Sequence, residues 1–188
     1  MSFRRIFGAG VFMAILSCAP SIKQYYPGNF DSEKRTYKNK SLGFSLTFRG
    51  SWNITANPNE MSKTSRGYSK ELHKSGAELL FSGSTVENTQ GTRCIVVNLN
   101  EPCDEYAEQI RQINKAEIDS DSGCAFDTIK GVPLVVWKYA KNEFDFIEYF
   151  FTIDTYDIRM AFWTKPKLFY NFLPIYEEIM STLSIETR

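Results

Sequence analysis

The sequence predicts an α+β domain, built on an antiparallel β-sheet of about six or seven strands with helices on both faces. Short turns separate successive apolar runs in the C-terminal half, and such turns indicate antiparallel neighbours because a parallel crossover needs about a dozen residues. In the run 144–153, Phe146 and Phe150 lie on one face, whereas Ile147 and Tyr149 lie on the other. A strand that is apolar on both faces must be covered on both, and two amphipathic helical patterns can cover it.

Four short segments of the N-terminal half have the pattern of strands. Residues 44–48 alternate apolar and polar side chains between two glycine-containing turns, which predicts a half-buried strand. Residues 52–54 begin a further short strand with Trp52. The stretch 37–40, the turn at 41–43 and the strand 44–48, with this aromatic residue on the next strand, predict a compact opening hairpin. The apolar runs 77–86 and 92–99 are separated by a turn and predict two longer strands.

The stretch 57–75 is polar and charged, and it contains Pro58, Gly67 and His73, the single histidine of the chain. We predict a long loop here, with at most one helical turn at 68–72. No cysteine lies near His73 in the sequence. We therefore expect a solvated loop histidine rather than a metal ligand or a catalytic base.

The stretch 101–114 has the period of an amphipathic helix. Tyr106, Ile110 and Ile113 recur at i, i+4 and i+7 and therefore fall on one face. Acidic side chains gather in the first turn, where the helix dipole favours them. Residues 115–127 are polar and predict an edge strand or an irregular segment.

The acidic run 117–123 suggests a calcium loop, but its spacing excludes an EF-hand. Counted from Asp119, glycine falls at position 5 instead of 6, and Lys130 occupies position 12, where a bidentate glutamate is needed. The count from Glu117 fails at the same two positions. We therefore predict a solvated acidic turn and no metal site.

The C-terminal part of the chain predicts three successive strands and a last helix. The strands cover residues 134–139, 144–153 and 156–163. Residues 165–172 have the composition of a connector, and Pro174 fits the first turn of the helix, where a missing N–H is tolerated. Apolar residues at helical spacing form the expected buried stripe, namely Ile175, Tyr176, Ile179 and Leu183.

The first eighteen residues resemble a bacterial lipoprotein signal. Arg4 and Arg5 precede an uncharged apolar run at 6–17, which is too short for a membrane-spanning helix. The run ends in a serine followed by Cys18, as in a lipobox. This resemblance implies that residues 1–17 are removed as a signal peptide and that Cys18 carries a diacylglyceryl group and a further acyl chain such as palmitate. The alternatives are an ordinary signal peptide and an apolar helix that happens to end in cysteine.

Under the lipoprotein interpretation, residues 18–35 form a lipidated tether, since prolines and a glycine interrupt a polar stretch there, and residues 36–188 form the domain. Two or more acyl chains hold a protein firmly at a membrane surface. We therefore expect a cell-envelope protein that is anchored through Cys18. Ala19, which follows it, implies sorting to the periplasmic face of the outer membrane in bacteria that resemble the enteric Gram-negatives.

Both ends of the domain resemble PsbP-like domains. The opening stretch reads Tyr-x-Asn from Tyr37, turns into Gly-Phe-Ser at Gly43 and closes on Trp52. The last strands and helix are similar to the same family, which includes the extrinsic P subunit of photosystem II and DcrB-type bacterial lipoproteins. The resemblance covers residues 36–185, and it implies an α/β/α sandwich without a shared active site.

Three cysteines remain in the domain if Cys18 is lipidated, so at least one thiol has no internal partner. In the predicted topology, a strand rises through Cys94 and the following helix descends by about 18 Å from Cys103. The next segment rises again through Cys124, which places Cys103 and Cys124 at one end of the domain and Cys94 at the other. We predict a Cys103–Cys124 disulfide, and the alternative is three free or partly buried thiols.

The charge balance excludes one class of partner. The chain has 22 Lys+Arg and 22 Asp+Glu residues, so no basic surplus attracts nucleic acid. We expect a non-enzymatic, membrane-anchored binding or assembly module that contacts an envelope protein and needs no cofactor or metal. The alternative is binding of a small apolar ligand in a groove formed by the aromatic residues at 144–163. A hydrolase is a third hypothesis, for which the sequence shows no nucleophile–base motif.

Overall fold

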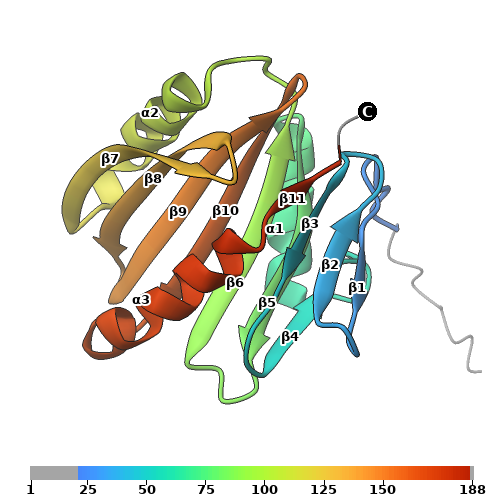
Figure 1. The fold of residues 1–188 in the computed structure, drawn as a ribbon, viewed down its shortest axis with the longest axis horizontal. Coiled ribbons are helices and arrows are strands. Elements are labelled where there is room, and N and C mark those ends of the chain that lie inside the picture. The colour runs from blue at the N-terminus through green and yellow to red at the C-terminus, as the bar shows by residue number, and fades with distance from the viewer. Residues whose placement is uncertain (1–20, 187–188) are drawn as a thin grey trace, which may run out of the picture.

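The computed structural model describes residues 21–186 and has the α+β class that the sequence predicts (Figure 1). Within these residues, it contains a seven-stranded sheet, a four-stranded sheet and three α-helices. The elements follow one another as β1 (Asn29–Asp31), β2 (Thr36–Asn39), β3 (Phe44–Thr47), β4 (Trp52–Thr55), α1 (Lys63–Lys74), β5 (Ala77–Thr85), β6 (Gln90–Val97), α2 (Cys103–Asn114), η1 (Lys115–Glu117), β7 (Ser120–Ile129), β8 (Val132–Lys141), β9 (Phe144–Ile153), β10 (Tyr156–Thr164), α3 (Pro166–Ser181) and β11 (Ser184–Ile185).

The seven-stranded sheet has the order β4-β5-β6-β10-β9-β8-β7, and every neighbouring pair is antiparallel. Strands β7 to β10 form the predicted meander, in which each strand pairs with the next along the chain. In β9, Phe150 packs on one face of the sheet, whereas Ile147 and Tyr149 pack on the other. Strand β7 lies at one edge of the sheet, as its polar composition predicts.

Helices cover both faces of this sheet, but the two covers differ. Helix α1 packs on β5 and β6 through Tyr68 and Leu72, and α2 packs on β8 and β9 through Tyr106. The opposite face carries the four-stranded sheet and α3 (Figure 1). The Tyr176 ring of α3 stacks on that of Phe162, with 4.8 Å between the ring centroids. This second face holds the main core of the domain.

The four-stranded sheet has the order β1-β2-β3-β11, and the sequence does not predict it as a separate layer. Tyr37 of β2 is fully buried, and its ring centroid lies 4.5 Å from that of Phe81 in the large sheet. The same ring lies 5.7 Å from that of Phe44 in β3. Strand β11 follows α3 and pairs with β3, so the C-terminal end of the chain completes the layer that the N-terminal hairpin begins.

The predicted domain boundary at residue 36 differs from the structure, because the described part of the predicted tether packs on the domain. The backbone N–H groups of Tyr25 and Tyr26 donate to the buried Glu78 carboxylate at 2.7 and 3.2 Å. The N–H of Ile22 donates to Asn59 Oδ1 at 2.9 Å, and β1 pairs with β2. Protein acceptors thus satisfy backbone donors that a free tether would expose to water, so the folded domain includes residue 22.

The prediction of a loop after β4 is wrong, because helix α1 forms there. Ser62 caps the helix, since its side-chain oxygen accepts a hydrogen bond from the Ser65 N–H at 3.2 Å. Tyr68 and Leu72 are four residues apart and cover apolar residues of β5 and β6. His73 lies in the last turn of this helix.

Helix α3 begins at Pro166 instead of Pro174, so the predicted connector is helical. Pro166 occupies the first turn, where no N–H partner is needed. Pro174 lies inside the helix and leaves the carbonyl of Tyr170 without its usual donor. The Tyr170 residue is 80% exposed, so this side of the helix faces solvent and tolerates the lost bond.

Candidate functional site

A groove lies between strands β7 to β9 and the C-terminal half of α3, on the face of the large sheet that carries the main core. Its volume of about 570 Å³ is within the range of small-molecule binding sites. Most of the lining is apolar. The apolar side chains at the groove come from Ala125, Phe126, Ile129, Val136, Ile147 and Met180.

The period of each element directs these side chains into the groove. Val136 of β8 lies opposite Tyr149 of β9 in the antiparallel register, so both face the same side of the sheet. Glu177 and Met180 are three residues apart on α3 and form one ridge above the strands. The groove therefore has a sheet as its floor and a helix as one wall.

The hydroxyl of Tyr149 is the unusual polar group of the groove. The Tyr149 residue is only 2% exposed, and its hydroxyl has no hydrogen-bond partner within residues 21–186. Burial raises the pKa of Tyr149, and the nearby carboxylates of Glu177 and Asp127 raise it further. The phenol is therefore neutral and remains a hydrogen-bond donor.

Three charged side chains line the groove. Lys138 comes from β8, Asp127 from β7 and Glu177 from α3. Within the described part of the chain, no ion pair joins any of the three to an opposite charge. The groove thus combines an apolar floor, one unpaired donor and charges at several points, which suits a ligand with an apolar body and a few polar atoms.

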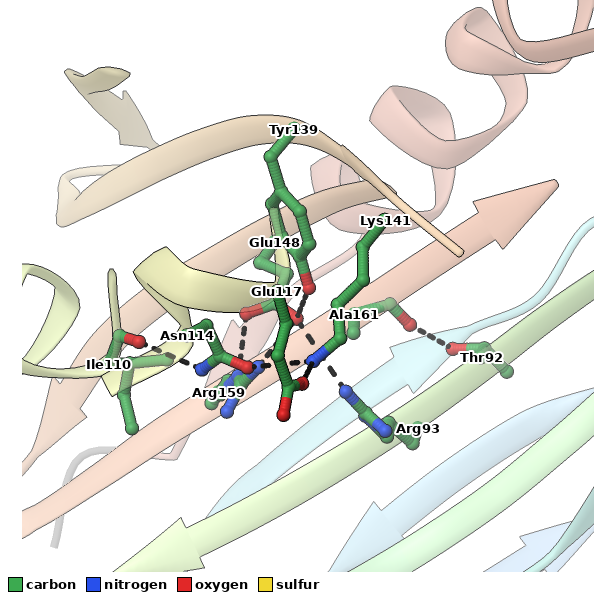
Figure 2. Close-up of polar contacts among 10 residues, drawn as sticks. All are labelled: Thr92, Arg93, Ile110, Asn114, Glu117, Tyr139, Lys141, Glu148, Arg159 and Ala161. Atoms are coloured by element: carbon green, nitrogen blue, oxygen red, sulfur yellow. Dashed lines mark hydrogen bonds and ion pairs between the residues drawn. The ribbon is translucent and has the colours of Figure 1, made fainter. Parts of the chain in front are cut away.

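On the opposite face of β9, a buried ion pair joins β9 to β10 (Figure 2). Arg159 Nε and Nη2 donate to the two oxygens of Glu148 at 2.5 and 2.7 Å, and the Tyr139 hydroxyl donates to Glu148 at 2.9 Å. Burial raises the pKa of the Glu148 carboxyl, but the Arg159 guanidinium outweighs this effect, so that pKa lies below its ordinary value. Burial lowers the pKa of Arg159, but the Glu148 carboxylate outweighs this effect, so the pKa of Arg159 lies above its ordinary value. Both groups are therefore charged at neutral pH.

The ligand hypothesis expects the aromatic residues at 144–163 to form one groove, but they lie on both faces of the sheet. Phe151 and Phe162 fill the main core, where Phe162 stacks on α3. Phe146 and Trp163 lie on the other face with 5.9 Å between their ring centroids. Tyr149 alone among these aromatic residues lines the groove, so the hypothesis holds only for a groove with mainly aliphatic walls.

The predicted cysteine sites are only partly covered by the structure. Cys18 lies outside the described residues. Cys103 begins α2, whereas Cys124 lies close to Arg111 in the last turn of the same helix. All three described cysteines, including the buried Cys94, are free thiols. The Cys103–Cys124 disulfide is not formed in this structure and stays a prediction.

The other sequence candidates have structural roles. His73 is half-buried in α1 instead of solvated in a loop, and its ring lies 5.8 Å from that of Tyr25, which belongs to the packed N-terminal segment. In the acidic run, Asp121 accepts hydrogen bonds from Arg111 Nε at 2.7 Å and from Trp137 Nε1 at 3.0 Å. Residues 21–186 contain no group of three or more His, Cys, Asp or Glu side chains that could hold a metal ion. Among the helices of these residues, none combines the length and apolar character that crossing a bilayer requires.

Sequence reasoning missed the Glu148–Arg159 pair, although a signal for it is present. Each residue is charged and stands at an inward position of a mainly apolar strand. Charged side chains are almost never fully buried unless they are paired. Two such residues of opposite charge on neighbouring strands therefore predict one another.

No model of a known protein family matches the chain, and no curated protein matches it in sequence. Among solved structures, cyanobacterial PsbP (CyanoP) from Synechocystis sp. PCC 6803 matches with a TM-score of 0.56 at 9% identity, over 80% of this chain and 91% of that chain. A protein of unknown function from Pseudomonas aeruginosa, PA94, has a TM-score of 0.45 at 12% identity, over 52% of this chain and 75% of that chain. A protein from Bacteroides thetaiotaomicron has a TM-score of 0.47 at 12% identity, over 78% of this chain and 46% of that chain.

The CyanoP match spans most of each chain. At 9% identity it bears on the fold alone. It agrees in fold with the family resemblance, and the structure places Tyr37 in β2 and Trp52 at the start of β4, with Gly43 directly before β3. The chain therefore has a PsbP-like fold.

Proposed function

We propose that this chain is a non-enzymatic binding module of the bacterial cell envelope, held at a membrane through lipid on Cys18, and that it binds a small apolar ligand in the groove. The observation that carries the proposal is the Tyr149 hydroxyl, a buried donor without a partner within residues 21–186, on a residue that lines a mainly apolar groove. An unpaired buried hydroxyl destabilises a protein by about 1–3 kcal/mol. A ligand with an apolar body and an acceptor oxygen would fill the groove and accept a hydrogen bond from this hydroxyl.

The state of the thiols and of the buried carboxylate supports a non-catalytic role. Burial raises the pKa of Cys94 and Cys103, and partial desolvation raises that of the more exposed Cys124, so each thiol is protonated and weakly nucleophilic at neutral pH. The Glu148 carboxylate accepts three hydrogen bonds from Arg159 and Tyr139, which leaves it poorly placed to remove a proton from a substrate.

Binding of Prodan, a neutral naphthalene ketone with environment-sensitive fluorescence, tests the groove. We expect saturable binding with a Kd of about 0.1 mM, since drug-sized ligands gain about 0.3 kcal/mol per non-hydrogen atom. Ala125→Trp fills the groove from its exposed rim and is expected to weaken binding at least about tenfold. Ala116→Trp is the matched control, because Ala116 is exposed and lies outside the groove.

A second variant separates binding from folding. Tyr149→Phe removes the unpaired hydroxyl, so it is expected to leave stability unchanged or to raise it by about 1 kcal/mol while it weakens Prodan binding. Equal binding by wild type and Ala125→Trp would contradict the groove as the site.

An envelope protein that inserts an apolar side chain is the second candidate occupant, and it would co-purify with wild type but not with Ala125→Trp.

Membrane fractionation of Cys18→Ala tests the anchor. Without the thiol no acyl chain can be attached, so we expect the variant to leave the membrane pellet for the soluble fraction. Cys124→Ala is the control, because it removes an exposed thiol from the folded domain. Retention of Cys18→Ala in the pellet at the wild-type level would contradict the lipoprotein proposal. Separation of inner and outer membranes then shows whether the wild-type protein follows the outer-membrane prediction from Ala19.

A further inference from the structure

Arg93 lies on the face of the sheet opposite to the groove, and its guanidinium makes no hydrogen bond within residues 21–186. Its Cζ atom lies 5.0 Å from the ring centroid of Tyr68 in α1 and 5.6 Å from that of Trp163 in β10. The Nε atom is covered by protein without a partner, whereas 25% of the side chain is exposed. Two aromatic rings thus hold a guanidinium that still has donors open to solvent.

The carboxylate beside Arg93 is already occupied (Figure 2). Arg93 Nη2 lies 3.8 Å from Glu148 Oε1, which is too far for a hydrogen bond. The same oxygen accepts hydrogen bonds from Tyr139 and from Arg159. Two guanidinium groups therefore share one carboxylate, and the cluster carries a net charge of +1.

The sequence around Arg93 makes room for this arrangement. Gly91 lies directly opposite Trp163 across the β6–β10 pair. A Cβ atom on Gly91 would lie 2.1 Å from the Trp163 ring, so a larger residue would displace the ring from its place beside Arg93. Phe146 lies 5.9 Å from Trp163, and both rings are half-buried, which extends the aromatic surface away from the guanidinium.

We propose that Arg93 binds the carboxylate of a ligand that has an aromatic or other apolar body. A guanidinium matches a carboxylate through two parallel N–H···O bonds, and the rings of Tyr68 and Trp163 restrict it to few orientations, which lowers the entropic cost of binding. The net positive charge of the cluster favours an anion, and Trp163 with Phe146 offers apolar contact to the body. This site does not depend on the groove, which lies on the other face of the sheet.

Titration of isotope-labelled protein with sodium benzoate, followed by NMR at constant ionic strength, tests the proposal. We expect a saturable shift of the Trp163 indole N–H signal with a Kd of about 5 mM, as ligand size allows. Inorganic phosphate has the charge but no apolar body, so it should bind about tenfold more weakly. Sodium chloride at matched ionic strength should give no saturable shift.

Variants locate the site. Arg93→Gln is expected to weaken benzoate binding at least about tenfold, whereas Arg66→Gln, which removes an exposed arginine of α1, should leave it unchanged. Gly91→Ala should weaken binding by moving Trp163. If Arg93→Gln does not fold, Arg93→Lys replaces it, because lysine keeps the charge but loses the two-pronged contact and should weaken binding as well. No saturable shift in wild type, equal binding by the Arg93 variant, or tighter binding of phosphate than of benzoate would overturn the proposal.

Discussion

Glu148→Gln is expected to lower the free energy of unfolding by about 3 kcal/mol or more. The substitution nearly conserves volume but removes the anion that pairs with Arg159, whose side chain is only 8% exposed. The unpaired guanidinium then remains buried close to Arg93, the second cation of the cluster. Urea denaturation monitored by circular dichroism measures the loss.

The matched control is Glu143→Gln, because Glu143 forms an ion pair with Lys165 in which its side chain is 86% exposed. Exposed pairs contribute little, so this variant should change stability by less than about 1 kcal/mol. Combined replacement of Glu148 by Leu and Arg159 by Met should recover part of the loss, since apolar pairs often replace buried ion pairs without penalty. Equal losses of unfolding free energy in Glu148→Gln and Glu143→Gln would contradict a stabilising role of the buried Glu148–Arg159 pair.

The same pair predicts how stability depends on pH. The pKa of Glu148 in the folded protein lies below its ordinary value of 4.5, mainly because Arg159 outweighs the effect of burial. Its contribution is therefore fully present above the unfolded pKa and is lost as the pH falls through the folded pKa. The stability difference between wild type and Glu148→Gln should narrow below pH 4.5. If the difference in unfolding free energy between the two proteins stays the same on acidification, the charge of the Glu148 carboxylate is not the cause of that difference.

Tyr37→Ala is expected to lower the free energy of unfolding by about 3–5 kcal/mol, the range for truncating a buried aromatic residue. The Tyr37 ring is fully buried and contacts Phe81 of the large sheet and Phe44 of the small sheet. Its hydroxyl accepts a hydrogen bond from Asn39 Nδ2 at 3.0 Å. The variant therefore loosens the interface between the two sheets, and chemical denaturation measures the effect.

Limited proteolysis provides a second measurement for this variant, because loss of the interface should expose the N-terminal segment to cleavage before the rest of the domain. Tyr170→Ala makes the same chemical change at a residue that is 80% exposed, so it should cost less than about 0.5 kcal/mol. A small effect of Tyr37→Ala, comparable to that control, would mean that the small sheet docks through other contacts.

The sequence predicts the strands well because their patterns are local. The apolar run 144–153 coincides with β9, whose alternation of faces follows from a period of two. Helix α1 escapes prediction because its apolar side offers little more than Tyr68 and Leu72 in a polar, glycine-containing stretch. The four-stranded sheet is not predicted, because a local pattern shows that a strand exists but not which layer it joins.

The candidate sites depend on contacts between distant parts of the chain. Asp127 and Glu177 line the same groove only because the fold brings β7 and α3 to its borders. The surroundings of Arg93 include Tyr68 of α1, a helix that the sequence patterns did not indicate. The Glu148–Arg159 pair is the exception, since charge at inward strand positions already predicts a partner.

The hydrogen bonds that fasten the N-terminal segment also limit how far the domain can stand from a membrane. Four peptide units separate Cys18 from Ile22, whose N–H is bound by Asn59. An extended chain spans at most about 3.6 Å per residue, so with lipid on Cys18 this surface of the domain would remain within about 14 Å of the anchor, whereas a free chain up to residue 36 would reach about 65 Å. A module on so short a tether would keep one side facing the bilayer. It would therefore contact partners in its own membrane and would not reach those across the periplasm.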